Sequence, residues 1–496
     1  MSVAADKPDR PLDAQDFEHA GEIAAPPASV ADPVPPQIAS HADPRKEGAS
    51  TRPLWKTFLV FLAPMLLSNI LQSLSGTLNN VYLGQMIGVK ALAAVSGFFP
   101  IMFFFIAFTI GLGAGASVLI GQAWGARQFD KARAVAGTTI TVGVLFGLLV
   151  AVFGGTFTRP MLVALGTPPD ILPDAINYAR IILIAMPGLF VFLLSTAMLR
   201  GVGDTVTPLY TLTISTALGL LITPALIRGW FGLPQMGVAS GACATVVAFV
   251  VATVWLGLRL RRTRSPLAPD ADFVQHLRVR PALLKGVLKI GVPTGVQMIV
   301  VSLAELALLS FVNAYGSDAT AAYGAVNQVV AYVQFPAISI AITASILGAQ
   351  AIGAGRTERL GAITRTALMM NLVLTGALVV LGYLFSRHLM GFFITSEPVI
   401  DMAQTLLHIM LWGTVIFGMG SALSGIMRAS GSVLVPTAIS IFCIALIEVP
   451  VAWTMSQHFG LKGIWIAYPA AFVVMLTMQA GYYRFVWRKK AIRALI

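Results

Sequence analysis

The chain has 496 residues, of which 57% are hydrophobic and only 11% are charged, and its formal net charge is +12. Soluble domains carry about 25% charged residues. A water-soluble fold is therefore excluded, because its surface would expose large apolar patches. The two cysteines, Cys243 and Cys443, both fall in apolar stretches, which excludes a disulfide framework.

Residues 1–52 differ in composition from the rest of the chain. They are rich in proline, alanine and aspartate, and their acidic residues outnumber their basic ones. Such a segment cannot bury enough apolar surface to fold, and it lacks the apolar region of a signal peptide. We expect it to be a disordered cytoplasmic tail.

Twelve apolar stretches follow, each long enough to cross a bilayer core of about 30 Å as a helix. They do not alternate in polarity as the strands of a membrane barrel do. The sequence therefore predicts an all-α polytopic membrane protein. The predicted spans are 57–78, 94–121, 134–157, 175–198, 206–228, 236–259, 285–313, 319–350, 360–386, 400–425, 433–455 and 462–486.

The basic residues lie mainly on one side of these spans. If residue 1 is cytoplasmic, all but six of the 33 lysines and arginines fall on the cytoplasmic side. Cytoplasmic loops are enriched in these residues, so both ends of the chain and the connection at 259–284 are expected there. This asymmetry accounts for the positive charge without a nucleic-acid partner. The six exceptions are Lys90, Arg159, Arg180, Arg228, Arg387 and Lys462.

The sequence repeats itself at an offset of 228 residues. Gly-Gln-Ala-Trp-Gly-Ala at 121–126 returns as Ala-Gln-Ala-Ile-Gly-Ala at 349–354. Leu-Arg-Gly-Val-Gly at 199–203 returns as Met-Arg-Ala-Ser-Gly at 427–431. Because each unit holds six spans, both units enter the membrane from the same side, as parallel repeats.

This duplication predicts two pseudo-symmetric six-helix lobes around a central cavity. The N-lobe is expected at 53–258 and the C-lobe at 285–487. A cytoplasmic linker at 259–284 joins them, and residues 488–496 form a cytoplasmic tail. Prolines inside the spans, such as Pro187 and Pro450, give places where helices can bend.

The duplicated blocks resemble the multidrug and toxic compound extrusion (MATE) family, as does Leu83-Gly84 followed by Gly88 and the Ala-Leu-Ala-Ala run at 91–94. The resemblance covers roughly 55–487. It implies a V-shaped cavity and a secondary active transporter, not an enzyme, that exports amphipathic or cationic organic compounds by antiport with protons or sodium ions. It also implies alternating access of the rocker type in a bacterial inner membrane. We expect a monomer with no cofactor and no bound metal.

Only two acidic residues lie away from the ends of the spans, Glu305 in the seventh and Glu448 in the eleventh. A carboxylate at mid-membrane costs about 2.5–3.5 kcal/mol, so it faces a cavity, pairs with a partner or is protonated. The resemblance implies an ion-coupling role for Glu305, which lies one helical turn from the family's acid in that span. At the position of the family's first-helix acid this chain has Asn79, whose amide cannot take up and release a proton.

Two interpretations of each acid stay open. Glu305 is either the coupling-ion site of the second lobe or a protonated, hydrogen-bonded structural residue. Glu448 is either a second coupling residue or a partner for a backbone group that Pro450 frees.

Polar side chains within the spans form a second candidate set. An amide at the lipid face would lack hydrogen-bond partners, so these groups should point inward, where they line the cavity or bridge helices. A methionine joins them because its flexible side chain adapts to varied substrates. The cavity candidates are Gln72, Asn79, Gln297, Asn327, Gln328, Tyr332 and Met102.

Three other functions would also suit a polytopic membrane protein. A lipid-linked oligosaccharide or lipid flippase of the same superfamily is the nearest alternative, although its cavity is expected to be basic and these spans contain almost no internal lysine or arginine. A membrane enzyme would need a catalytic cluster, whereas the six histidines are scattered. A passive channel would differ in moving solute only downhill.

Overall fold

The structure is a computed structural model that describes residues 53–496. The tail expected at 1–52 lies outside the described residues. Within the described part, eleven helices are long and apolar enough to cross a membrane, and a bent helix pair supplies a twelfth span. The chain is a multi-pass membrane protein whose described part is all-helical, as the sequence predicts.

The first six spans form the N-lobe. They are α2 (Leu54–Met86), α3 (Val89–Gly125), α4 (Phe129–Ala164), the pair α5 (Leu172–Ile184) and α6 (Met186–Gly201), α7 (Val206–Arg228) and α8 (Ala239–Arg262). The short α9 (Ala271–Gln275) lies in the connection between the lobes.

The other six spans form the C-lobe. They are α10 (Pro281–Asn313), α11 (Ser317–Gly353), α12 (Leu360–Leu384), α14 (Glu397–Ala429), the continuous run α15 (Leu434–Cys443), η4 (Ile444–Glu448) and α16 (Val449–Phe459), and α17 (Leu461–Phe485). The short α13 (Ser386–Gly391) precedes α14.

The fourth span, predicted at 175–198, is bent by 54° where α5 meets α6. Pro187 is the second residue of α6, and because it has no backbone N–H it removes one hydrogen bond between the two turns. Val415 lies 228 residues later, and the C-lobe helix there, α14, is a single helix of 33 residues. The two lobes are therefore similar but not identical.

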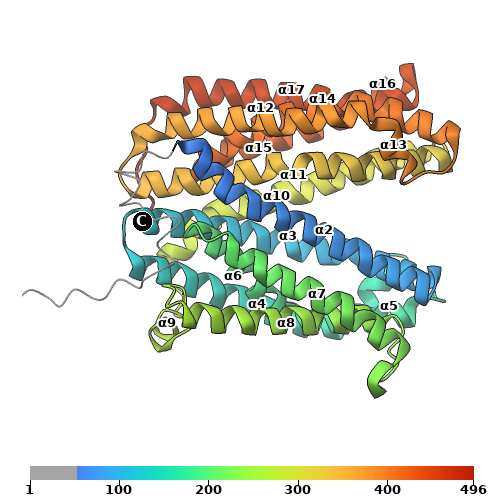
Figure 1. Cartoon of the computed structure of the whole chain (residues 1–496), viewed down its shortest axis with the longest axis horizontal. Helices are drawn as coiled ribbons and strands as arrows, with labels where there is room; N and C mark the ends of the chain where they lie inside the picture. The colour runs from blue at the N-terminus through green and yellow to red at the C-terminus, as the bar shows by residue number, and fades with distance from the viewer. Residues whose placement is uncertain (1–52) are drawn as a thin grey trace, which may run out of the picture.

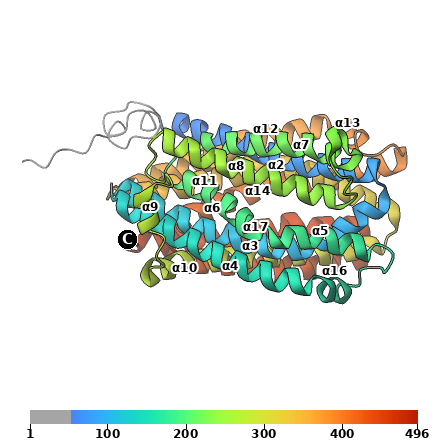
Figure 2. The same cartoon turned by 90° about the horizontal axis from the view of Figure 1, so that it is seen from below.

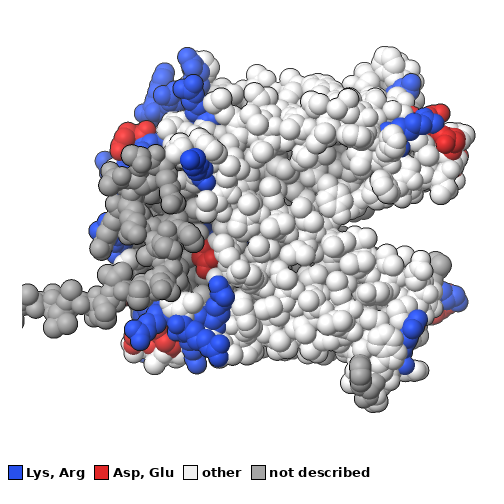
Figure 3. Space-filling model, viewed as in Figure 1, with Lys and Arg blue, Asp and Glu red and all other residues white. Residues whose placement is uncertain are grey.

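The lobes form two bundles, which lie one below the other in Figure 1 and one in front of the other in Figure 2. We call the end at which α2 begins and α17 ends the base, and the opposite end the mouth. Figure 3 shows the bundles touching at the base and separated by a deep notch at the mouth. On this face the lysines and arginines gather mainly at the base.

The apolar cores explain this shape. One core fills the base and contains residues of both lobes, such as Phe58 of α2 and Ile346 of α11. Toward the mouth each lobe has a core of its own, around Phe98 in the N-lobe and around Trp465 in the C-lobe. The lobes therefore share buried contacts at the base and not at the mouth.

The most extensive contact between the two lobes is the crossing of α3 and α10. Gly111 and Gly115 lie one turn apart on α3, and Gly291 and Gly295 lie one turn apart on α10. A Cβ atom on Gly111 would lie only 2.4 Å from the carbonyl oxygen of Gly291. Small residues at this spacing let membrane helices bring their backbones into contact, so the crossing requires glycine.

Helix α10 also makes contacts in both lobes. Just before it, the chain is held on α4, where Thr138 and Thr141 donate hydrogen bonds to the carbonyl oxygens of Arg278 (3.3 Å) and Leu277 (2.6 Å). The base half of α10 then packs on α3, and the helix also packs on α15, η4 and α16 of the C-lobe. Pro293 lies within the helix.

The α3–α10 crossing can be tested with Gly291→Ala. The new Cβ atom would lie 2.8 Å from the carbonyl oxygen of Gly111, and overpacking of this kind costs about 1–3 kcal/mol. We expect a lower apparent Tm in thermal unfolding in detergent. Gly376→Ala on α12 is the control, because nothing lies within 4 Å of its added Cβ atom. Equal Tm values for the two variants would contradict the tight crossing.

Candidate functional site

A cluster of polar and aromatic side chains lies in the mouth half of the C-lobe. Tyr323 on α11 and Tyr468 on α17 place their hydroxyl oxygens 3.2 Å apart, within hydrogen-bond distance. Both side chains are buried, and the fully buried ring of Trp465 lies 5.2 Å from that of Tyr323. The indole N–H of Trp465 has no hydrogen-bond partner among the described residues, although buried donors in proteins are normally paired. The cluster therefore has an unused donor.

The two membrane acids belong to the same cluster. Glu448 is buried, with 5% of its surface accessible, whereas the side chain of Glu305 is exposed. The two carboxyl groups lie near enough to interact electrostatically with each other and with the hydroxyl groups of Tyr323 and Tyr468. The sequence alone could not show how far apart these two acids lie, because they come from different helices. The fold places both in one lobe, Glu305 at its surface and Glu448 in its interior.

Local backbone structure directs Glu448 inward. It ends the five-residue π-helical turn η4, and Pro450 is the second residue of the following α16. A proline at that place leaves a carbonyl of the preceding turn without its usual donor, and a π turn is a widened segment that often marks functional positions. Leu446, two residues earlier, is 62% exposed, so the turn places the apolar side chain outside and the acid inside.

The predicted cavity residues lie in different parts of the structure. Asn327 is one turn from Tyr323 on α11 and lies on the same face of the helix, so it belongs to the C-lobe cluster. Gln297 and Gln328 are half-buried, and Tyr332 is exposed, with its ring 5.5 Å from that of Phe335. One of these amides therefore lies on the helix face that carries the tyrosine of the cluster.

The N-lobe candidates form no part of that cluster. Asn79 accepts a hydrogen bond of 3.4 Å from the hydroxyl of Thr223 on α7, so it bridges helices inside its own lobe. Gln72 is exposed on α2, and Met102 packs against the mouth core of the N-lobe.

Sequence reasoning missed the tyrosine pair. Tyr323 could have been found, because it lies four residues before Asn327 and so shares its helix face. Tyr468 had no such signal, since its partner is 145 residues away in the chain.

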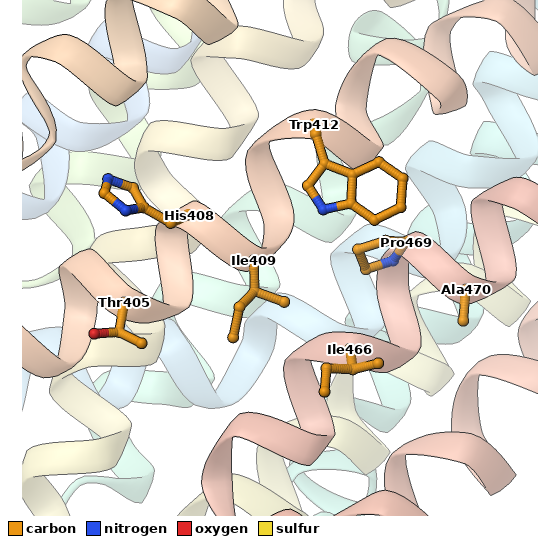
Figure 4. A pocket seen from close by; sticks show the side chains of 7 residues that line it. All are labelled: Thr405, His408, Ile409, Trp412, Ile466, Pro469 and Ala470. Carbon is orange, nitrogen blue, oxygen red and sulfur yellow. The ribbon is translucent and has the colours of Figure 1, made fainter.

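A separate apolar groove of about 680 Å³ runs between α14 and α17 (Figure 4). His408 and Trp412 of α14 and Ile466 of α17 line it, and Trp412 is 46% exposed. His408 is engaged through its Nε2 atom with the hydroxyl of Ser386 at 2.9 Å. None of the predicted acids or amides lines this groove.

At the base, the repeated blocks form a two-fold latch between the lobes. The side-chain amide of Gln122 donates to the carbonyl oxygen of Ala429 at 2.7 Å, and that of Gln350 donates to the carbonyl oxygen of Gly201 at 3.1 Å. Gln350 and Ala429 each lie 228 residues after Gln122 and Gly201, so the two bonds are the same contact related by the repeat. Such a contact is isologous, and it holds the base closed.

Two duplicated lobes of six spans, joined at one end and apart at the other, define a membrane protein with the architecture of a secondary transporter. Residues 64–225 and 293–454 each match the family described as MatE, and the matches begin 229 residues apart (293 − 64). The chain belongs to the MatE family. The resemblance to MATE proteins, the duplication and the two-lobed fold are thereby confirmed.

Known relatives cover nearly the whole chain. A Bacillus subtilis (strain 168) protein described as probable multidrug resistance protein YoeA is 45% identical over 445 residues, which is 89% of this chain and 96% of the relative. The Staphylococcus aureus (strain MSSA476) multidrug export protein MepA is 23% identical over 414 residues, 83% of this chain and 89% of the relative. A crystal structure of a variant of the Vibrio cholerae MATE transporter VcmN shares the fold, with a TM-score of 0.82 at 20% identity over 88% of this chain and 98% of that one.

The tyrosine pair can be tested by a double-mutant cycle. Tyr468→Phe keeps the ring but leaves the buried hydroxyl of Tyr323 without this partner, which costs about 1–3 kcal/mol. Replacing both tyrosines by phenylalanine removes donor and acceptor together and should restore much of that stability. Thermal unfolding of the two single variants and the double variant measures the coupling. Additive losses, with the double variant the least stable, would show that the hydroxyls do not interact.

Proposed function

We propose that this chain is a multidrug efflux transporter that exports cationic or amphipathic organic compounds by antiport with protons or sodium ions. The observation that carries the proposal is the acid pair of the C-lobe, Glu305 and Glu448, in a fold with a notch open at the mouth. The name of the Bacillus subtilis relative, a probable multidrug resistance protein, supports the substrate class.

The different depths of the two acids suit them to ion coupling. An exposed carboxylate in a membrane span is tolerated where it meets water, so Glu305 is proposed to line the notch. Glu448 lies behind it, with only 5% of its surface accessible. A cation that enters at Glu305 would neutralise the carboxylate charge, which is costly to keep inside the lobe. Release of the cation would make that charge unfavourable again.

The asymmetry between base and mouth supports alternating access. The basic residues at the base favour a cytoplasmic base, since lysine and arginine concentrate on that side of membranes. The structure would then be open to the outside. Export would require the lobes to part at the base and meet at the mouth, as in rocking transporters built from parallel repeats. We propose that a single chain is the working unit, because both lobes and the notch belong to it.

A lipid-linked oligosaccharide flippase is disfavoured. A pyrophosphate would need basic groups facing the cavity, whereas the two most deeply buried arginines, Arg200 and Arg428, lie in the last turns of α6 and α14, at the base. An acid pair beside tyrosine and tryptophan rings suits an organic cation better, because aromatic faces attract cations.

Transport in proteoliposomes tests the proposal. With a pH gradient or a sodium gradient imposed separately, one of the two should drive ethidium against its own concentration gradient. We expect Glu305→Gln and Glu448→Gln each to reduce this gradient-driven transport by at least about tenfold, equivalent to about 1.4 kcal/mol of lost coupling. Exchange of ethidium for ethidium, without an ion gradient, should persist because the fold remains.

Glu397→Gln is the matched control. Glu397 is an exposed acid at the start of α14, at the mouth, where it pairs with Arg387, so its variant should transport normally. If Glu305→Gln and Glu448→Gln also transport normally under every gradient, the acids are not the coupling site. If no gradient moves ethidium in the natural sequence, the antiport proposal fails for this substrate class.

A further inference from the structure

The segment 487–496, which follows α17, is packed against the base rather than extending away from it. It begins in the C-lobe, where the buried indole of Trp487 donates a hydrogen bond to the hydroxyl of Ser430 at 2.9 Å. The same ring stacks on Tyr483 with 5.2 Å between the ring centres. The start of the segment is therefore fixed to the end of α17 and to the turn after α14.

The segment then reaches the N-lobe. The backbone N–H of Leu495 donates to the side-chain oxygen of Gln122 at 2.7 Å. Ile492 and Ile496 pack against the apolar core that both lobes share at the base. Figure 1 marks the end of this segment at the base, between the two bundles.

The side chain of Gln122 thus makes two hydrogen bonds at once. Its amide nitrogen donates to the carbonyl oxygen of Ala429 in the opposite lobe, and its amide oxygen accepts from the backbone N–H of Leu495. The side chain itself is fully buried. Its repeat mate Gln350 is only partly buried. In the described part of the chain, the oxygen of Gln350 receives no equivalent backbone N–H from a segment like 487–496. The segment therefore adds to one half of an otherwise two-fold latch.

We infer that residues 487–496 form a strap that stabilises the base-closed state and must leave Gln122 before the base can open. The inference rests on the proposed alternating access, because only then do the lobes separate at the base. The physical reason is the position of the strap: it is bound to the C-lobe at Trp487 and to the N-lobe at Leu495, so parting the lobes stretches or breaks one attachment. The strap thereby sets the balance between the two states.

The size of the effect follows from the contacts. One hydrogen bond between neutral groups contributes about 0.5–1.5 kcal/mol, which corresponds to a shift of about two- to tenfold in the ratio of base-open to base-closed molecules. Loss of the apolar contacts of Ile492 and Ile496 as well should shift the ratio further in the same direction.

Two variants separate these contributions. Leu495→Pro removes the donated N–H but keeps an apolar side chain. A chain shortened after residue 490 removes the Leu495 bond and both isoleucines, while it keeps Trp487. Ala494→Pro is the matched control, because it brings the same ring constraint at a neighbouring residue whose N–H has no assigned partner among the described contacts.

Distances between spin labels measure the populations. Labels at Lys131 and Glu358, exposed residues of the two lobes near the base, report opening there, and labels at Asp174 and Ser396 report the mouth. Cys243 and Cys443 are first replaced by alanine. The measurements are made in the full chain and in a Gln350→Ala background, in which the other half of the latch is already weakened and open molecules are more numerous.

We expect Leu495→Pro to raise the base-open population by about two- to tenfold, the shortened chain to raise it more, and Ala494→Pro to leave it unchanged. An unchanged population for both Leu495→Pro and the shortened chain, in both backgrounds, would overturn the inference. An equal shift for Ala494→Pro would overturn the specific role of Gln122. The distance measurement needs neither substrate nor ion gradient. If antiport fails but the base-open population shifts as expected, the proposed function is contradicted and the inference about the strap is supported.

Discussion

The contact on which the structure depends is the backbone approach of α3 and α10 at their paired glycines, Gly111 and Gly115 with Gly291 and Gly295. In lipid, apolar side chains gain little by meeting each other, so helices associate through close packing and hydrogen bonds. Both occur at the base, where this crossing is joined by the glutamine latch. Because the shared apolar core lies at the same end, the lobes are held there and stand apart at the mouth.

Helix α10 connects the contacts between the lobes at the base to the cluster that contains Glu305 and Glu448. Its base half packs on α3 of the N-lobe, whereas its mouth half carries Glu305 beside Glu448 of η4. Pro293 lies within the helix, and a proline inside a helix is a common place for bending. A change of charge at Glu305 would thus act on the helix that touches both lobes. This geometry agrees with the proposed coupling and gives it a physical route.

The repeat is kept where the lobes meet and broken where chemistry is proposed. The contacts of Gln122 and Gln350 are equivalent, since a two-fold interface needs the same surface on both partners. The two membrane acids, Glu305 and Glu448, lie in the C-lobe, whereas in the N-lobe Asn79 accepts a hydrogen bond from Thr223. The strap adds a second asymmetry at Gln122. The two lobes therefore share a scaffold and differ in their buried polar groups.

The sequence by itself determined the spans, their common direction in the two units and the two membrane acids, because hydropathy, basic residues and a fixed offset are local or periodic signals. It could not show that Glu305 and Glu448 lie near enough to interact electrostatically, or that Tyr323 contacts Tyr468, because those pairs come from helices far apart in the chain. The same holds for the 54° bend at α5–α6 and for the bond from Leu495 to Gln122. Such contacts depend on how the helices pack, which only the tertiary structure decides.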